Sequence, residues 1–177
     1  LNGIVVVPYD HKEETRTIEV MEAGHPIPDE KSAMSSRRIM QSICGLTGED
    51  LVIALISGGG SAALSLQAKG ITLAEKQLVI QALLQSGASI TEINSIRQIL
   101  SGIKGGRLAV AARPARIHTL IVSDVVGDNP GIVSAGPTLP ATCFEPVTEI
   151  LERYKLDIPS KLKDFLTSDH KVTQLDK

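Results

Sequence analysis

The feature that most constrains the fold is an apolar run that ends in a glycine cluster. Residues Leu51–Ile56 are all apolar, several of them β-branched, and Ser57-Gly58-Gly59-Gly60-Ser61 follows at once. A run of this length and composition predicts a strand that is buried on both faces, as in parallel sheets. Successive glycines can point backbone N–H groups into one concavity, which suits a phosphate or a carboxylate. The other interpretation of Ser57–Ser61, called the glycine loop below, is a flexible turn between strand and helix.

Strand-like and helix-like segments alternate along the chain. This order predicts the α/β class, as a three-layer α/β/α sandwich that is Rossmann-like, with a mostly parallel sheet. Strands are expected at residues 3–7, 16–21, 51–56 and 117–122. Capping boxes at Thr72–Glu75 and Ser89–Glu92 predict the starts of two helices. The expected helices cover residues 29–44, 72–86, 89–100, 108–112, 145–154 and 160–166.

Composition excludes several classes of protein. Eighteen basic and twenty acidic residues give a formal charge of −2, and aromatic residues make up 2%. Such a chain offers neither a basic surface nor stacking platforms for nucleic acid. Cys44 and Cys143 are far apart without metal-ligand spacing, which fits a reduced cytoplasmic protein. No apolar run is long enough for a membrane helix, and no signal peptide is present, so no membrane partner is expected.

The start of the chain predicts a fragment. It opens on Leu1 and enters the apolar segment Ile4–Val7 almost at once, whereas natural termini usually begin with a polar segment. We therefore expect residues 1–177 to be part of a larger protein.

Charged side chains follow the glycine-containing segments. Arg97, Lys104 and Arg107 surround a Gly-Gly pair, and composition alone favours a solvated basic helix end as the explanation. Asp124 and Asp128 follow the apolar strand that ends at residue 122. Carboxylates at that edge of a sheet can hold Mg²⁺ together with waters and substrate phosphate, or can simply initiate turns.

The segment Glu22–Asp29 contains two prolines, so regular structure is not expected there. His25 lies between glycine and proline in this loop, where it either fixes the loop by hydrogen bonds or contacts a ligand. An anion-binding loop, cations and carboxylates at one sheet edge form the set of groups that phosphoryl transfer requires. The glycine loop has neither the Walker ending nor the dinucleotide fingerprint, and the missing fingerprint argues against an oxidoreductase.

Several segments in order resemble one family. They are Glu22–Asp29, Leu55–Ala62, Gly87–Asn94, Ile96-Arg97, Leu100-Ser101, Ile103–Ala109, Ser123–Asp128 and Ala135–Thr138. With these blocks the sequence resembles the glycerate 2-kinases, long labelled hydroxypyruvate reductases, which carry a C-terminal domain called MOFRL. The sequence departs from the common family pattern at Gln98 and at Val133-Ser-Ala.

The resemblance implies ATP-dependent phosphorylation of D-glycerate to 2-phosphoglycerate, with ATP and Mg²⁺ as cofactors and glycerate as partner. It implies that residues 1–177 are the central and C-terminal part of the N-terminal α/β/α domain, facing a second domain across the active-site cleft. The family's upstream segment with a functional lysine and its second domain are missing, so the chain alone is expected to be catalytically weak. The oligomeric state stays open, a homo-oligomer included.

The resemblance also implies roles for single residues. The glycine loop, Ser57, Gly58, Gly59, Gly60 and Ser61, would hold phosphate or the glycerate carboxylate. Arg97, Lys104 and Arg107 would bind anionic oxygens, and Glu22 and His25 would line the cleft. Asp124 and Asp128 would bind metal or accept a proton. The sequence leaves two alternatives open, an NAD(P)-dependent hydroxypyruvate reductase and a non-catalytic sugar-phosphate-binding module.

Overall fold

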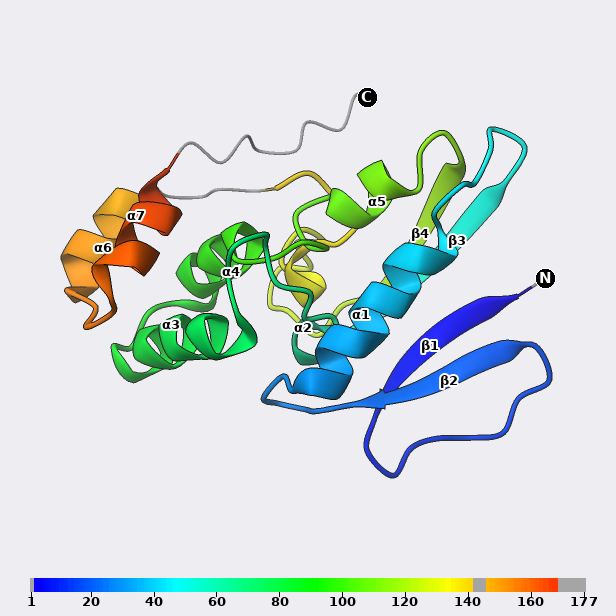
Figure 1. The fold of residues 1–177 in the computed structure, drawn as a ribbon, viewed down its shortest axis with the longest axis horizontal. Helices are drawn as coiled ribbons and strands as arrows, with labels where there is room; N and C mark the ends of the chain where they lie inside the picture. Colours follow the sequence, from blue (N-terminus) through cyan, green and yellow to red (C-terminus); the bar gives the residue numbers. More distant parts are fainter. Residues whose placement is uncertain (1, 142–145, 169–177) are drawn as a thin grey trace.

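The computed structural model describes residues 2–141 and 146–168, and it confirms a mixed α/β fold with parallel strands (Figure 1). The strands are β1 (Gly3–Pro8), β2 (Ile18–Ala23), β3 (Leu51–Ser57) and β4 (Arg116–Val122). The α-helices are α1 (Glu30–Ser42), α2 (Gly60–Ala63), α3 (Leu73–Gln85), α4 (Ile90–Ile99), α5 (Arg107–Ala111), α6 (Val147–Tyr154) and α7 (Ser160–Thr167). A short 3₁₀ helix, η1, covers Val133–Ala135.

The strands form two parallel pairs among the described residues, β1 with β2 and β3 with β4. A parallel pair requires a crossover connection. The helices α2 to α5 provide the crossover between β3 and β4, whereas a loop joins β1 to β2. In the β3–β4 pair, Leu55 lies beside Leu120 and Ser57 beside Val122. Both strands of this pair therefore end at the same edge.

The expectation that the strand at residues 51–56 is buried on both faces is wrong for this structure. Burial alternates along both strands, with Leu55 and Val122 each 73% exposed. Successive strand residues point to opposite faces, and one face of the pair is not covered by the described residues. An uninterrupted apolar sequence predicts two buried faces, but it does not say which part of the polypeptide covers the second one.

Local sequence explains where the helices begin. Asp29 caps α1, and Thr72 and Ser89 form the predicted capping boxes of α3 and α4. In each box the side chain accepts a hydrogen bond from the third backbone N–H of the helix, which lacks a partner within the helix. Residue 145, the expected start of α6, lies outside the described residues, and α6 begins at Val147.

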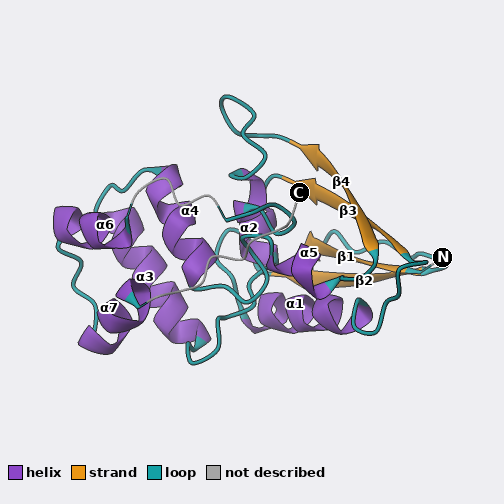
Figure 2. Cartoon of the chain, turned by 90° about the horizontal axis from the view of Figure 1, so that it is seen from above, coloured by secondary structure: helices purple, strands orange, loops and turns teal. Residues whose placement is uncertain are grey.

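The helices α3, α4, α6 and α7 gather at one end of the molecule, and the strands with α1 lie at the other end (Figures 1 and 2). The helical end has its own apolar core, which includes Val79, Leu83, Ile96 and Ile150. A smaller core beside the strands includes Ile103 and Leu108. The short elements α2 and η1 contact each other, and η1 also contacts α4 and β3, so they lie where the two ends meet.

Within the described ranges, no helix combines the length and apolar character needed to cross a membrane. Cys44 is exposed with a free thiol, and Cys143 lies outside the described residues.

Candidate active site at the glycine loop

The glycine loop connects β3 to α2 and depends on a left-handed backbone. Gly59 has φ +77°, a backbone conformation that residues with a side chain rarely adopt, and it immediately precedes α2. Ser57 ends β3, and Ser61 lies within α2. The three glycines are therefore placed at the end of the β3 strand.

Asp124 lies directly against the glycine loop. A Cβ atom added to Gly58 would lie 1.9 Å from Asp124 Oδ2, so any side chain at residue 58 would collide with the carboxylate. The two residues come together because β3 and β4 are parallel neighbours, and each lies just beyond the end of its strand. The predicted proximity of the glycine loop and Asp124 is thus present in the structure.

On its other side the glycine loop contacts Ser134 in η1. The Ser134 hydroxyl donates a hydrogen bond to the Ser57 carbonyl oxygen at 2.9 Å, and a Cβ on Gly60 would lie 2.3 Å from Ser134 Oγ. Lys104 Nζ donates to the Ser134 carbonyl oxygen at 3.0 Å. Ser134 therefore connects the glycine loop to Lys104.

The turn that carries Ser134 has an unusual backbone. Ser134 and Ala135 have φ +52° and +57°, left-handed values that are costly for residues with a side chain. The backbone N–H groups of Gly105 and Gly106 donate to the carbonyl oxygens of Ala135 and Gly136 at 3.2 and 2.9 Å. These bonds hold the turn against the segment that contains Lys104.

The interpretation of Lys104 as part of a solvated helix end is wrong. Helix α4 ends at Ile99, and the chain then turns inward, so that Lys104 is completely buried. Burial lowers the pKa of Lys104 well below its usual value, and the positive charges of Lys76 and Arg97 lower it further. The side chain thus combines a buried position with a strongly perturbed pKa, which is typical of functional sites.

The other predicted basic residues have different surroundings. Arg107 Nη1 donates to the carbonyl oxygens of Gln98 and Lys104, both at 2.9 Å, so this guanidinium stabilises the segment between α4 and α5. Arg97 is partly buried and donates to Asn94 Oδ1 at 3.2 Å. Of the two arginines, Arg97 is the one that acts electrostatically on Lys104.

Of the three remaining predicted residues, His25 faces the glycine loop, whereas Glu22 and Asp128 have other surroundings. A Cβ on Gly59 would lie 3.0 Å from His25 Nε2, so His25 faces the loop. Glu22 instead accepts a hydrogen bond from the Asp10 backbone N–H at 2.8 Å. Asp128 is exposed in a turn, with φ +50°.

Sequence reasoning missed Ser134 and Lys76. The contacts of Ser134 join segments about 30 and 77 residues apart in the sequence, and no local pattern predicts such contacts. Lys76 did carry a signal, because it lies at helical spacing within the apolar stripe that includes Leu73 and Leu83. A lysine in the apolar stripe of a helix is expected to be buried with that stripe, and Lys76 is 3% exposed.

The fit of the site to Mg²⁺ depends on Asp124. In residues 2–141 and 146–168, no three His, Cys, Asp or Glu side chains gather into a metal-binding group. Mg²⁺ commonly binds one or two carboxylates and completes its octahedron with water and substrate phosphate. A single carboxylate, that of Asp124 beside the glycine loop, is compatible with that mode of binding.

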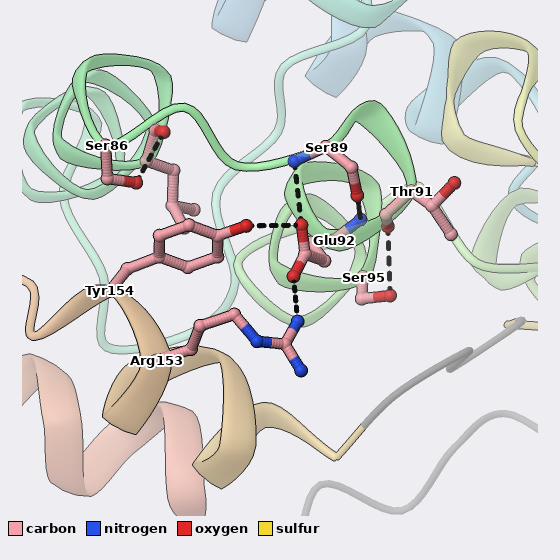
Figure 3. Close-up of polar contacts among 8 residues, drawn as sticks. Ser86, Ser89, Thr91, Glu92, Ser95, Arg153 and Tyr154 are labelled. Atoms are coloured by element: carbon pink, nitrogen blue, oxygen red, sulfur yellow. Dashed lines mark hydrogen bonds and ion pairs between the residues drawn. The ribbon is translucent and has the colours of Figure 1, made fainter.

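A cavity of about 540 Å³ lies between the first half of α4 and α6, and no residue of the glycine loop lines it. At its wall the Glu92 carboxylate accepts hydrogen bonds from the Ser89 backbone N–H at 2.7 Å and from Tyr154 Oη at 2.9 Å (Figure 3). Arg153 forms an ion pair with the same carboxylate. These contacts join α6 to the first turn of α4, which is a structural role.

Comparisons with known proteins match nearly the whole chain. Residues 1–167 match the family model described as a domain of unknown function, DUF4147. A provisionally named hydroxypyruvate reductase of Agrobacterium vitis is 48% identical over 95% of this chain and 44% of its own length. The D-glycerate 2-kinase of Thermotoga maritima is 40% identical over 91% of this chain and 39% of its own length. The chain thus spans about two fifths of these relatives.

A solved structure resembles the fold closely. The crystal structure of a glycerate kinase from Thermotoga maritima superposes with a TM-score of 0.86 and 39% sequence identity. The superposition covers 94% of this chain and 41% of that one. The similarity therefore extends over nearly all of the present chain and less than half of the solved enzyme.

Proposed function

The chain belongs to the DUF4147 family, and from this premise we propose that the full-length protein is an ATP-dependent kinase that phosphorylates D-glycerate at its 2-hydroxyl. The product is 2-phosphoglycerate. Relatives named D-glycerate 2-kinase and glycerate kinase support this reaction. Residues 1–177 are the central and C-terminal part of an N-terminal domain and supply one wall of the active-site cleft.

The observation that carries the proposal is the arrangement around the glycine loop. Asp124 Oδ2 lies 1.9 Å from the position that a Cβ of Gly58 would take, and Lys104 is bonded to Ser134, which contacts the loop on another side. Backbone N–H donors, a cation and a carboxylate thus occur within one small region. Phosphoryl transfer depends on this combination, because positioning and charge neutralisation supply most of its catalysis.

Each residue of the site has its own role in the proposed reaction. The glycine loop holds a phosphate group or the glycerate carboxylate through its backbone N–H groups. Arg97 and Lys104 neutralise anionic oxygens, while His25 lines the site at Gly59. Asp124 either accepts the proton of the substrate hydroxyl or holds Mg²⁺, and Asp128 is a second carboxylate four residues further on. Mg²⁺, when bound, neutralises charge on the phosphate groups.

A second candidate is the NAD(P)-dependent reduction of hydroxypyruvate. The name of the Agrobacterium vitis relative favours it. The glycine loop argues against it, because the sequence lacks the G-x-G-x-x-G spacing with which dinucleotide-binding folds hold a pyrophosphate. The kinase is therefore the function that the site supports better.

Two assays on the full-length protein separate these functions. We expect ADP release that depends on D-glycerate, and no NADH oxidation with hydroxypyruvate. Asp124→Asn should reduce kcat by roughly 100-fold or more, the usual cost of losing a group that acts in the transition state. The exposed Asp157→Asn serves as the matched control and should retain activity. NADH oxidation without ADP release, or full turnover by Asp124→Asn, would contradict the proposal.

A further inference from the structure

Three basic side chains act electrostatically on one another, and within the described residues none of them forms an ion pair with a carboxylate. They are Lys76 on α3, Arg97 on α4 and Lys104 in the turn after α4, and they are called the cation cluster below. Lys104 is 0% exposed and Lys76 is 3% exposed. Among the described residues, the ion pairs of the structure involve other basic side chains.

The hydrogen-bond partners of the cation cluster are all neutral. Lys76 Nζ donates to Ser65 Oγ at 3.0 Å, and Lys104 Nζ donates to the Ser134 carbonyl oxygen at 3.0 Å. An ammonium group has three N–H donors, and within the described part of the chain each lysine ammonium donates one hydrogen bond. Within the described residues, the cluster therefore has more N–H donors than its acceptors use, and its positive charge faces neutral acceptors only.

Such a cluster is unfavourable for the folded protein alone. Burial lowers the pKa of Lys76 to about 8, and the charge of Arg97 adds to this effect. Burial also lowers the pKa of Lys104, with further contributions from Lys76 and then Arg97. A group that served only packing would be better replaced by an apolar one. An anion bound between the three side chains would remove the unfavourable charge.

Two members of the cluster are hydrogen-bonded to residues that contact the glycine loop or follow it in the chain. Ser65, the partner of Lys76, lies two residues beyond the end of α2. Ser65 is fixed because its backbone N–H donates to Ser36 Oγ on α1 at 2.8 Å. Ser134, the partner of Lys104, contacts Gly60. Lys76 on α3 is therefore bonded to the segment that follows the glycine loop and α2, and Lys104 is bonded to the turn that contacts the loop.

We propose that Lys76 completes a phosphoryl-binding cluster in which Lys76, Arg97 and Lys104 together hold one phosphate group beside the glycine loop. This inference rests on the proposed kinase function and adds Lys76 as a binding residue. Arg97 is the partly exposed member, so it marks the side from which the phosphate enters. Three cations suit a doubly charged phosphate group better than the single charge of a carboxylate.

The test uses the full-length protein and inorganic phosphate as the probe. Thermal unfolding is followed at increasing phosphate concentration for the wild type, Lys76→Met, Lys76→Arg and Lys69→Met, whose lysine is exposed. We expect Lys76→Met to weaken phosphate binding by roughly 10- to 100-fold, the usual effect of one charged hydrogen bond. Lys76→Arg should retain most of the binding, and Lys69→Met all of it. Phosphate binding by Lys76→Met that equals wild type would overturn the inference.

Titration with D-glycerate in place of phosphate distinguishes the two anion classes. Lys76→Met should bind D-glycerate as the wild type does. If Lys76→Met instead loses D-glycerate binding and keeps phosphate binding, the phosphoryl assignment is wrong.

A measurement on the wild type avoids any folding defect of the variants. Phosphate raises the pKa of a lysine that it contacts, so binding at pH 9 should take up protons through Lys76 and Lys104. Arg97, the remaining cation facing them, stays charged. Calorimetry in two buffers of different ionisation heat measures this uptake, and the absence of uptake would contradict the inference. D-glycerate-dependent ADP release is measured separately, so that a failed kinase proposal and a failed role for Lys76 give different results.

Discussion

At the scale of single residues, the three glycines of the loop are required for three different reasons. Gly58 leaves room for the Asp124 carboxylate, and Gly60 leaves room for the Ser134 hydroxyl. Gly59 adopts a positive φ next to His25. A side chain at any of the three would change a different contact of the proposed active site.

Gly58→Ala should separate activity from stability in the full-length protein. The new Cβ would overlap Asp124 Oδ2, and the exposed aspartate can rotate away at little cost to folding. We expect the free energy of unfolding to change by less than about 1 kcal/mol, while kcat falls about 100-fold because the carboxylate is displaced. Steady-state kinetics and urea unfolding measure the two effects. Gly48→Ala is the control, because an added Cβ there would meet no atom within 4 Å outside its two chain neighbours. Unchanged kinetics in Gly58→Ala would contradict the assigned position of Asp124.

The sequence was sufficient to predict the glycine loop and Asp124, because each follows an apolar strand directly. It could not predict Ser134 as their neighbour. That contact depends on the left-handed turn at residues 134–136, which is held by hydrogen bonds to Gly105 and Gly106. Residue type alone also misjudged Lys104, since a lysine near a helix end is usually solvated.

At the scale of elements, Glu92 connects the start of α4 to the end of α6. Its carboxylate completes the α4 capping box with Ser89 and also contacts Arg153 and Tyr154 (Figure 3). The hydrogen bond with the Ser89 side chain is the largest cause that lowers the pKa of Glu92 to about 2. One carboxylate therefore stabilises two helices.

This pKa predicts how stability depends on pH. The folded pKa of about 2 lies below the ordinary value of 4.5, so the stabilisation is fully present above about pH 4.5 and is lost as pH falls toward 2. In Glu92→Gln, the loss of unfolding free energy between pH 5 and pH 3 should be smaller than in wild type. Urea unfolding at several pH values measures it, with the exposed Glu152→Gln as control. Identical pH profiles of Glu92→Gln and wild type would be inconsistent with this role.

The capping boxes at Thr72 and Ser89 were predictable because they are local patterns of four residues. The end of α4 was predicted to within one residue, at residue 100 instead of Ile99, although the apolar pattern itself does not stop there. Residues 99–103 continue the apolar helical spacing, but the helix stops at Ile99 and Ser101 forms long-range hydrogen bonds with the segment after α2. Tertiary contacts here override the helical pattern.

At the scale of the whole molecule, the β3–β4 pair has an uncovered apolar face. Leu51, Ile53 and Leu55 on β3 are 54, 57 and 73% exposed. Leu120 and Val122 on β4 lie on the same face, because they are the register partners of Leu55 and Ser57. Parallel strands are normally covered on both faces. Because the chain spans about two fifths of its relatives' length, we expect the rest of a full-length protein to cover this face.

Leu55→Lys tests that expectation in the full-length protein. If the face is covered, a buried lysine without a partner should reduce the free energy of unfolding by about 2–4 kcal/mol. Leu84→Lys, at a 58% exposed leucine of α3, should change it by less than about 0.5 kcal/mol. Urea unfolding compares the two variants. An equally small effect of both would mean that the face stays exposed.

The central claim is that the glycine loop and Asp124 belong to one active centre. A double-mutant cycle on kcat/KM for D-glycerate tests it most directly, using the full-length wild type, Gly58→Ala, Asp124→Asn and the variant with both changes. Because Gly58→Ala acts by displacing the Asp124 carboxylate, we predict that the double variant is no slower than Asp124→Asn alone. If the two losses instead multiply, the residues act independently, and the proposed centre is wrong.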